Sequence, residues 1–213
     1  IRARGALPVV TGGCGLYIRA LMYGLMPAPP ADPDLRARLE DEERERGPGH
    51  LHQRLVAVDP AAAERIHPAD LVRQVRALEV FELTGRPISE HQAEHGFAEP
   101  RYRALIWGID PGREQLRERI DGRVVQMMEE GFLKEVDGLL KRGIPADAPG
   151  LRSPGYREMV AHLAGELPLE EAVRLTQRAH RHYARRQRTW FRKTRGLSWY
   201  PDADSLPLEE ALS

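Results

Sequence analysis

The chain has 213 residues, of which 41% are hydrophobic and 30% are charged, with one cysteine and a formal net charge of zero. This length and composition fit a soluble globular protein with one sizeable core, or with a core and a small inserted domain. They exclude a disulfide framework and a cysteine zinc site within the chain, and no segment approaches the roughly 20 apolar residues that a membrane span needs.

The first predicted elements are a strand, a glycine-rich turn and a helix. Residues 7–11 are a short apolar run and predict a buried strand, residues 12–15 read Gly-Gly-Cys-Gly, and residues 16–22 carry apolar side chains at helical spacing. Such a turn points bare amides and the positive end of a helix dipole at its mouth, where a phosphate could bind. A simple tight connection explains it equally well. It is not a Walker A loop, because no Lys-Ser or Lys-Thr follows.

Residues 34–98 predict a helical block, which follows a proline-rich linker at 26–33. We expect helices over residues 34–46, 50–58, a short segment that begins at Asp59-Pro60, and 71–84, where Asp70 and Gly85 serve as caps. His91 and His95 have the spacing of a helical zinc pair. No third ligand accompanies them, so surface histidines are the favoured interpretation.

The remaining sequence alternates between a little strand and much helix. We expect a strand at 102–109, helices at 110–130, 132–142, 156–164 and 169–193, a loop at 144–154, and an edge strand at Trp199-Tyr200. Arg117, Arg119 and Arg123 lie on the first of these helices. They fit either a pyrophosphate clamp or an ion-paired, solvated face, and the second is favoured without other information.

Arginines recur along the predicted helix at 169–193 with alternating spacings of four and three residues. They are Arg174, Arg178, Arg181, Arg185, Arg188 and Arg192. This spacing puts six guanidinium groups on one stripe, which destabilises an isolated helix and so predicts an external polyanion such as RNA. The alternative is a merely solvated basic face. A neighbouring stripe is predicted to dock on the core, with Arg186 facing inward: Leu175, Ala179, Tyr183, Arg186 and Trp190.

Several segments resemble tRNA dimethylallyltransferases, in the order in which that family has them. They are VVTGGCGLYIRALMYGL at 9–25, ADPDLRARLE at 31–40, RIHPADLVRQVRALEVFELTGRPIS at 65–89, RERIDGRVVQMMEEGFLKEV at 117–136, PGYREMVAHLAGELPLEEA at 154–172 and HYARRQRTWFRK at 182–193. The resemblance covers nearly the whole chain. It implies an α/β fold with a P-loop NTPase-like parallel-sheet core and an inserted all-helical domain, mostly helical in this chain.

The resemblance also implies a domain organisation. Residues 1–29 would be a partial α/β core, residues 30–100 the helical insertion for tRNA, and residues 101–213 the C-terminal part of the core with basic RNA-binding helices. The family's P-loop, and the following Asp-Ser segment with its general-base aspartate, are not found in this sequence. We therefore expect that part of the enzyme precedes Ile1. We also expect the chain alone to be inactive and to expose core surface where further strands would pair.

The family transfers a dimethylallyl group from dimethylallyl diphosphate to N6 of the adenosine 3′-adjacent to the tRNA anticodon, releasing diphosphate. By resemblance, this protein would be a cytoplasmic monomer without a membrane association that uses Mg²⁺ and binds the tRNA anticodon stem-loop. Two alternatives stay open: a non-catalytic RNA-binding module, and an adenylate isopentenyltransferase acting on a free nucleotide. The helical block argues against the second, since a mononucleotide needs no RNA clamp.

Site residues follow from the same motifs. Cys14 and Arg123 are the implied catalytic residues, and together with Gly12 and Gly13 they would bind the diphosphate. The implied tRNA-binding residues are Gly15, Arg36, Arg73, Gln74, Arg76, Arg152, Gly155, Tyr156, Arg157, Arg185, Arg186, Gln187, Arg188 and Arg192. No metal ligand is assigned. The family has threonine at the position of Cys14, and a thiol is a poorer hydrogen-bond donor to a leaving diphosphate than a hydroxyl is.

Overall fold

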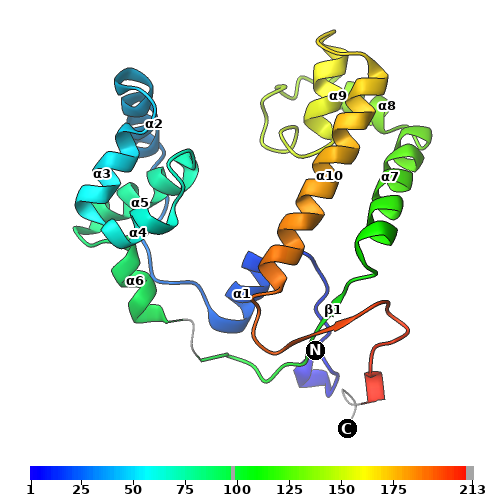
Figure 1. Cartoon of the computed structure of the whole chain (residues 1–213), viewed down its shortest axis with the longest axis horizontal. Helices are drawn as coiled ribbons and strands as arrows, with labels where there is room; N and C mark the ends of the chain where they lie inside the picture. The colour runs from blue at the N-terminus through cyan, green and yellow to red at the C-terminus, as the bar shows by residue number, and fades with distance from the viewer. Residues whose placement is uncertain (97–98, 210–213) are drawn as a thin grey trace. The chain divides into compact units, whose positions relative to one another are not determined.

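The computed structural model describes residues 1–96 and 99–209 of the chain (Figure 1). The chain folds as two compact units. One, here called the helical unit, is Leu16–Arg103. The other, here called the sheet unit, combines Ile1–Gly15 with Ala104–Ser213. Within the described ranges, no helix is both long enough and apolar enough to cross a membrane.

Short capped helices make up the helical unit. They are α1 (Gly15–Tyr23), α2 (Pro33–Arg46), α3 (His50–Val58), α4 (Pro60–Arg65), α5 (Leu71–Thr84) and α6 (Ile88–His95). Asp59 and Asp70 accept hydrogen bonds from the amides of Ala62 and Arg73, and Gly85 ends α5 with a left-handed φ of 70°, so the predicted caps are confirmed. The apolar faces of α2, α3 and α5 meet in a core that includes Leu39, Leu51, Leu55 and Leu78.

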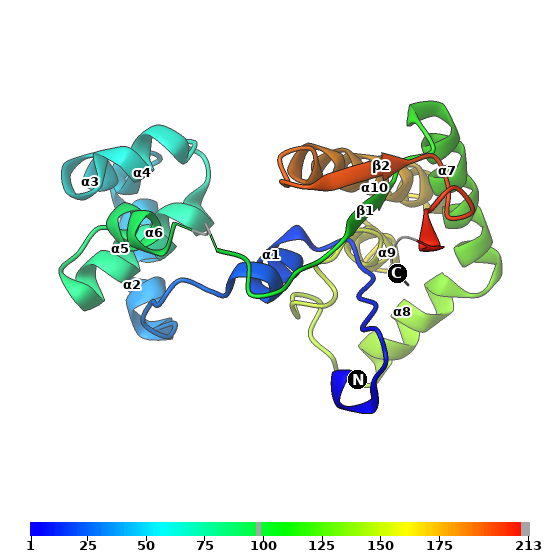
Figure 2. The same cartoon turned by 90° about the horizontal axis from the view of Figure 1, so that it is seen from below.

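The sheet unit packs helices beside a small parallel sheet. After a short 3₁₀ turn at Arg2–Arg4, its elements are β1 (Ile106–Ile109), α7 (Arg113–Glu129), α8 (Phe132–Lys141), α9 (Tyr156–Leu163), α10 (Leu169–Phe191) and β2 (Leu197–Tyr200). The strands β1 and β2 pair in parallel with Ile106 opposite Leu197, and Figure 2 shows the two strands side by side. The predicted edge strand is therefore confirmed. A second core joins α8, α9 and α10 through Phe132, Val136, Met159 and Ala172.

Residues 7–11 form no strand, which corrects the prediction of a buried strand at this position. Leu7, Val9 and Val10 have 55%, 75% and 65% of their surface exposed. The apolar run is compatible with a strand, but a strand needs a hydrogen-bonded neighbour, and in the described part of the chain β1 pairs only with β2. The predicted exposure of core-type surface is confirmed here. The domain boundary predicted at residue 29 stays a prediction. All of α1 except Gly15 belongs to the helical unit.

Candidate functional site

The Gly12–Gly15 turn lies directly against α10. The side-chain amide Nε2 of Gln187 donates a hydrogen bond of 2.9 Å to the carbonyl oxygen of Gly13. A Cβ added at Gly13 would lie 2.1 Å from that nitrogen, and one added at Gly15 would lie 2.0 Å from Nε1 of Trp190. Close approach by α10 therefore explains glycine at both positions without any ligand. Cys14 lies between them with an exposed thiol.

Arg123, the second implied catalytic residue, lies on the exposed side of α7, next to the fully buried Val124. Among the described residues no ion pair involves its guanidinium group, which is therefore available to an anion. No described contact joins it to the glycine turn. The ion-paired alternative applies instead to Arg117, whose Nε is 3.9 Å from the carboxylate of Asp121.

Carboxylates from other elements engage two members of the arginine stripe on α10. Arg188 Nη2 lies 2.8 Å from Oδ2 of Asp110, which directly follows β1. Arg181 forms an ion pair with Asp121 of α7, and Gln177 Nε2 donates to the backbone carbonyl of the same aspartate at 3.2 Å. These two arginines thus tie α10 to the rest of its unit. The sequence reasoning missed Asp110 and Asp121 as partners, because neither lies near the stripe in sequence.

Three stripe members face solvent, and we call Arg178, Arg185 and Arg192 the exposed arginine row. All three are exposed, and none has an ion pair in the part of the chain that the structure describes. Arg174, at the start of the stripe, is bound by Glu171 through two hydrogen bonds of 2.6 and 2.5 Å. The row is therefore the portion of the stripe that is free to meet a polyanion.

The adjacent stripe docks only in part: Leu175 and Ala179 are half-buried. Tyr183 and Trp190 are exposed. Arg186 is exposed too, with its guanidinium carbon 5.7 Å from the centre of the Tyr183 ring, so the prediction that it faces inward is wrong. Gln187, one residue on, faces inward and bonds to Gly13. Periodicity gives the width of a helix face, but the neighbours decide which face is buried.

The start of α9 combines a buried backbone with an exposed arginine. Gly155 is buried with φ of 94°, and its amide donates to Oε2 of Glu158 at 2.7 Å. The structure thus gives Gly155 a structural role, and the implied contact with tRNA stays a prediction. Arg157 remains exposed while its Nε donates to the other oxygen of Glu158 at 2.6 Å.

Tyr156 and Arg152 flank this turn. The hydroxyl of Tyr156 donates to Glu135 at 2.7 Å, and this hydrogen bond, followed by burial, raises the pKa of the tyrosine. Its ring packs edge-on against Phe132, with centroids 4.9 Å apart. Arg152 is exposed, 3.6 Å from Asp147. Tyr156 is thus held in place, whereas Arg152 can reorient.

In the helical unit, Gln74 is fully buried, and its Nε2 donates to the carbonyl oxygens of His67 and Pro68. Its side chain has no exposed surface in this unit, and its implied role as a tRNA contact stays a prediction. Arg73, next to it on α5, is well exposed and lies 2.7 Å from Asp70.

Arg36 and Arg76 share one buried carboxylate, that of Glu79. Arg36 grips it with two hydrogen bonds of 2.8 and 2.9 Å, from Nε and Nη2. Arg76 pairs with Oε2, and the amide of Asp32 donates to Oε1 at 2.8 Å. Burial would raise the pKa of Glu79, but the hydrogen bonds from Arg36, Arg76 and Asp32 outweigh it and lower the pKa to about 2.

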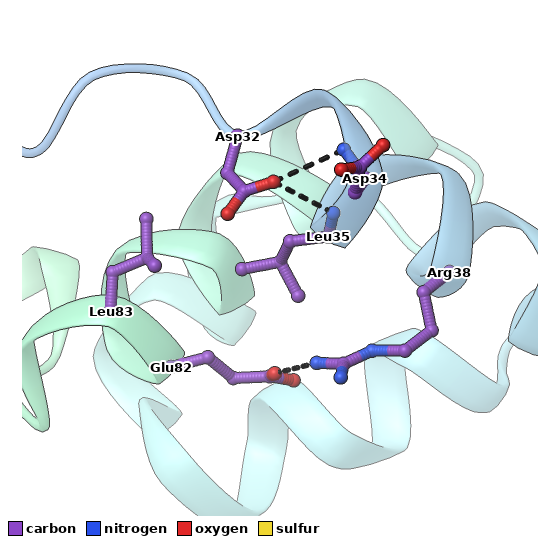
Figure 3. A pocket seen from close by; sticks show the side chains of 6 residues that line it. All are labelled: Asp32, Asp34, Leu35, Arg38, Glu82 and Leu83. Carbon is purple, nitrogen blue, oxygen red and sulfur yellow. Dashed lines mark hydrogen bonds and ion pairs between the residues drawn. The ribbon is translucent and has the colours of Figure 1, made fainter.

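A shallow pocket of about 440 Å³ opens beside the N-terminus of α2, as Figure 3 shows. Its lining is Asp32, Asp34, Leu35, Arg38, Glu82 and Leu83. The only cation in this set, Arg38, is already paired with Glu82. With three carboxylates around it, the pocket does not fit a diphosphate or an RNA backbone.

Charge is divided unequally between the two units. The helical unit contains 12 Arg and Lys against 15 Asp and Glu, a net charge of −3, and the sheet unit contains 20 against 17, a net charge of +3. The neutral total therefore hides a basic unit that carries α10. In the described residues, no group of three or more His, Cys, Asp or Glu side chains could hold a metal ion.

Comparison with known proteins places these features in a family. The family model for IPP transferases matches residues 1–194. The chain is 51% identical over 203 residues to the tRNA dimethylallyltransferase of Geobacter sulfurreducens, covering 94% of this chain and 65% of that protein. It is 52% identical over 199 residues to the enzyme of the same name from Anaeromyxobacter dehalogenans strain 2CP-1, covering 93% and 65%.

Solved structures agree. The full-length tRNA isopentenylpyrophosphate transferase of Bacillus halodurans is 36% identical with a TM-score of 0.59, over 100% of this chain and 65% of that one. A eukaryotic dimethylallyltransferase acting on tRNA is 25% identical with a TM-score of 0.71, over 100% and 56%. The chain belongs to the IPP transferase family. It spans about 65% of the length of the two curated relatives named above.

Proposed function

We propose that this chain is part of an enzyme that transfers a dimethylallyl group from dimethylallyl diphosphate to N6 of the adenosine 3′-adjacent to the tRNA anticodon, releasing diphosphate. The observation that carries the proposal is the 51% identity to a tRNA dimethylallyltransferase over 94% of the chain. The exposed arginine row on α10 supports it, because RNA binding depends on unpaired cations that can reach phosphates.

In this proposal the donor diphosphate lies at the mouth of the Gly12–Gly15 turn. Cys14 is exposed there and Arg123 has a free guanidinium group, so both side chains are available to the leaving group. A guanidinium fork matches phosphate oxygens and would stabilise the charge that develops as the C–O bond to the dimethylallyl group breaks. The adenosine must leave the base stack to reach this position, which explains why RNA has to be held firmly.

The resemblance further implies a P-loop NTPase-like core, a cytoplasmic monomer and Mg²⁺, and these remain parts of the proposal. The described residues offer no metal-binding cluster. The side chains that the structure describes therefore do not make up a complete Mg²⁺ site by themselves, and no step is assigned to the ion.

A prenyl-transfer assay on an anticodon stem-loop RNA tests the function. The protein would be assayed alone and fused to the part of the Geobacter sulfurreducens relative that it does not span, with AMP as a competing acceptor. We expect the fusion to modify the stem-loop, to leave AMP unmodified, and to lose activity when the target adenosine is replaced by guanosine. A folded fusion that binds the RNA but transfers nothing would contradict the enzyme and support the non-catalytic RNA-binding module.

A further inference from the structure

The buried ion pair cluster in the helical unit has more positive than negative members. Glu79 is fully buried, whereas the side chains of Arg36 and Arg76 keep 39% and 31% of their surface exposed. Two guanidinium groups therefore meet at one carboxylate and leave a net charge of +1 at the surface. Without that carboxylate they would repel one another.

Each arginine has only part of its donor set occupied. Arg36 uses Nε and Nη2 on Glu79, and Arg76 uses Nη1 on Glu79 and Nη2 on the carbonyl oxygen of Pro29. Since a guanidinium group carries five N–H donors, each retains donors for a further acceptor. These contacts hold both guanidinium groups in place, which favours binding of an oxyanion because less side-chain entropy is lost.

The charge of the surrounding unit makes such positioning necessary. With a net charge of −3, the helical unit repels a polyanion at long range, so any RNA contact there depends on a few arginines in defined positions. Glu79 also stays ionised at neutral pH, because its pKa is lowered to about 2.

We propose that Glu79 is a positioning residue that holds Arg36 and Arg76 together as a phosphate clamp for the substrate RNA. This inference rests on the proposed function and adds a residue that does not itself touch RNA. The proposal predicts a change in RNA affinity opposite to the one expected for a carboxylate near a polyanion. Removing the negative charge of Glu79 would raise affinity by electrostatics alone, but it lowers affinity if the charge serves to position the two arginines.

The variant Glu79→Gln tests this sign in the full chain, with binding of an anticodon stem-loop RNA measured across a range of salt concentrations. We expect about a tenfold loss of affinity, equivalent to about 1.4 kcal/mol, and a salt slope reduced by about one unit. Glu82→Gln is the matched control. Glu82 lies on the same helix and pairs with Arg38 and Arg54, so its removal should leave affinity unchanged or raise it.

Thermal unfolding monitored by circular dichroism shows whether Glu79→Gln is folded at the temperature of the assay. If it is not, the double variant Arg36→Lys with Arg76→Lys decides, since it keeps both charges but cannot form the forked contacts. Unchanged or tighter binding by whichever folded variant is used would overturn the positioning role. If the parent chain and its active fusion both fail to bind the RNA, the proposed function fails instead.

Discussion

At the scale of single residues, the glycine turn is explained by how closely α10 approaches it. Trp190 offers a rigid ring to Gly15, whereas Gln187 offers the flexible end of a side chain to Gly13. Gly12 has open space around it and no left-handed φ. The three glycines of this turn therefore differ in how much space the structure leaves for a side chain at their positions.

Replacing these glycines by alanine should separate them. We expect Gly15→Ala to lower the free energy of unfolding by about 1–3 kcal/mol, because the new methyl group overlaps the Trp190 ring. Gly13→Ala should cost about 1 kcal/mol through the lost hydrogen bond from Gln187. Gly12→Ala is the control and should stay within about 0.5 kcal/mol. Urea denaturation measures all three, and equal effects at Gly12 and Gly15 would contradict the contact with Trp190.

At the scale of elements, α10 carries two kinds of arginine that share one periodicity. Arg181 and Arg188 bind aspartates of the same unit, and the exposed arginine row faces solvent. A charge-reversal experiment that includes Arg188 would confuse loss of RNA contacts with loss of the ion pair to Asp110. The proposed RNA surface is therefore best tested at Arg178, Arg185 and Arg192, with Arg186 beside them.

Replacing Arg178, Arg185 and Arg192 by alanine should weaken stem-loop binding and reduce the slope of log K against log salt by roughly 2–3 units, as three phosphate contacts are lost. The control is a triple alanine variant of Lys134, Lys141 and Arg142, which removes the same charge from α8 and its end. Fluorescence anisotropy titrations at several salt concentrations give both slopes. If the control reduces the slope as much as the α10 variant does, net charge and not the row determines binding.

At the scale of the whole molecule, the apolar side chains of residues 7–10 affect solubility more than stability. Leu7, Val9 and Val10 are exposed and contribute nothing to either core. Exposed apolar chain without a paired neighbour favours association between molecules.

The pair Val9→Asp and Val10→Asp should therefore raise the concentration at which the protein aggregates, measured by light scattering, and change stability by less than about 0.5 kcal/mol. Val124→Asp, at a fully buried position of the same unit, is expected to unfold that unit. A marked drop in melting temperature for the Val9 and Val10 variant would show that these side chains are packed.

Local chemistry made much of the fold predictable. The caps at Asp59, Asp70 and Gly85 and the helices they bound follow from side-chain hydrogen bonds and backbone conformations of neighbouring residues, so the sequence predicts them correctly. The helix α6 (Ile88–His95) was not singled out, because its residues are largely polar and show no strong apolar period. The family could also be identified from the sequence, because its motifs are short and occur in a fixed order.

Tertiary structure alone decided which way side chains face and which charged side chains form ion pairs. Arg188 differs from Arg185 only in what lies opposite, Asp110 or solvent, and Arg186 is exposed although it was expected to face inward. Residues 7–11 have the composition of a strand but lack a paired neighbour. The sequence by itself determined the family, the helices and the positions of the arginines. Contacts between segments distant in sequence determined which arginines stabilise the fold and which stay exposed without an ion pair among the described residues, because burial and ion pairing depend on neighbours in space.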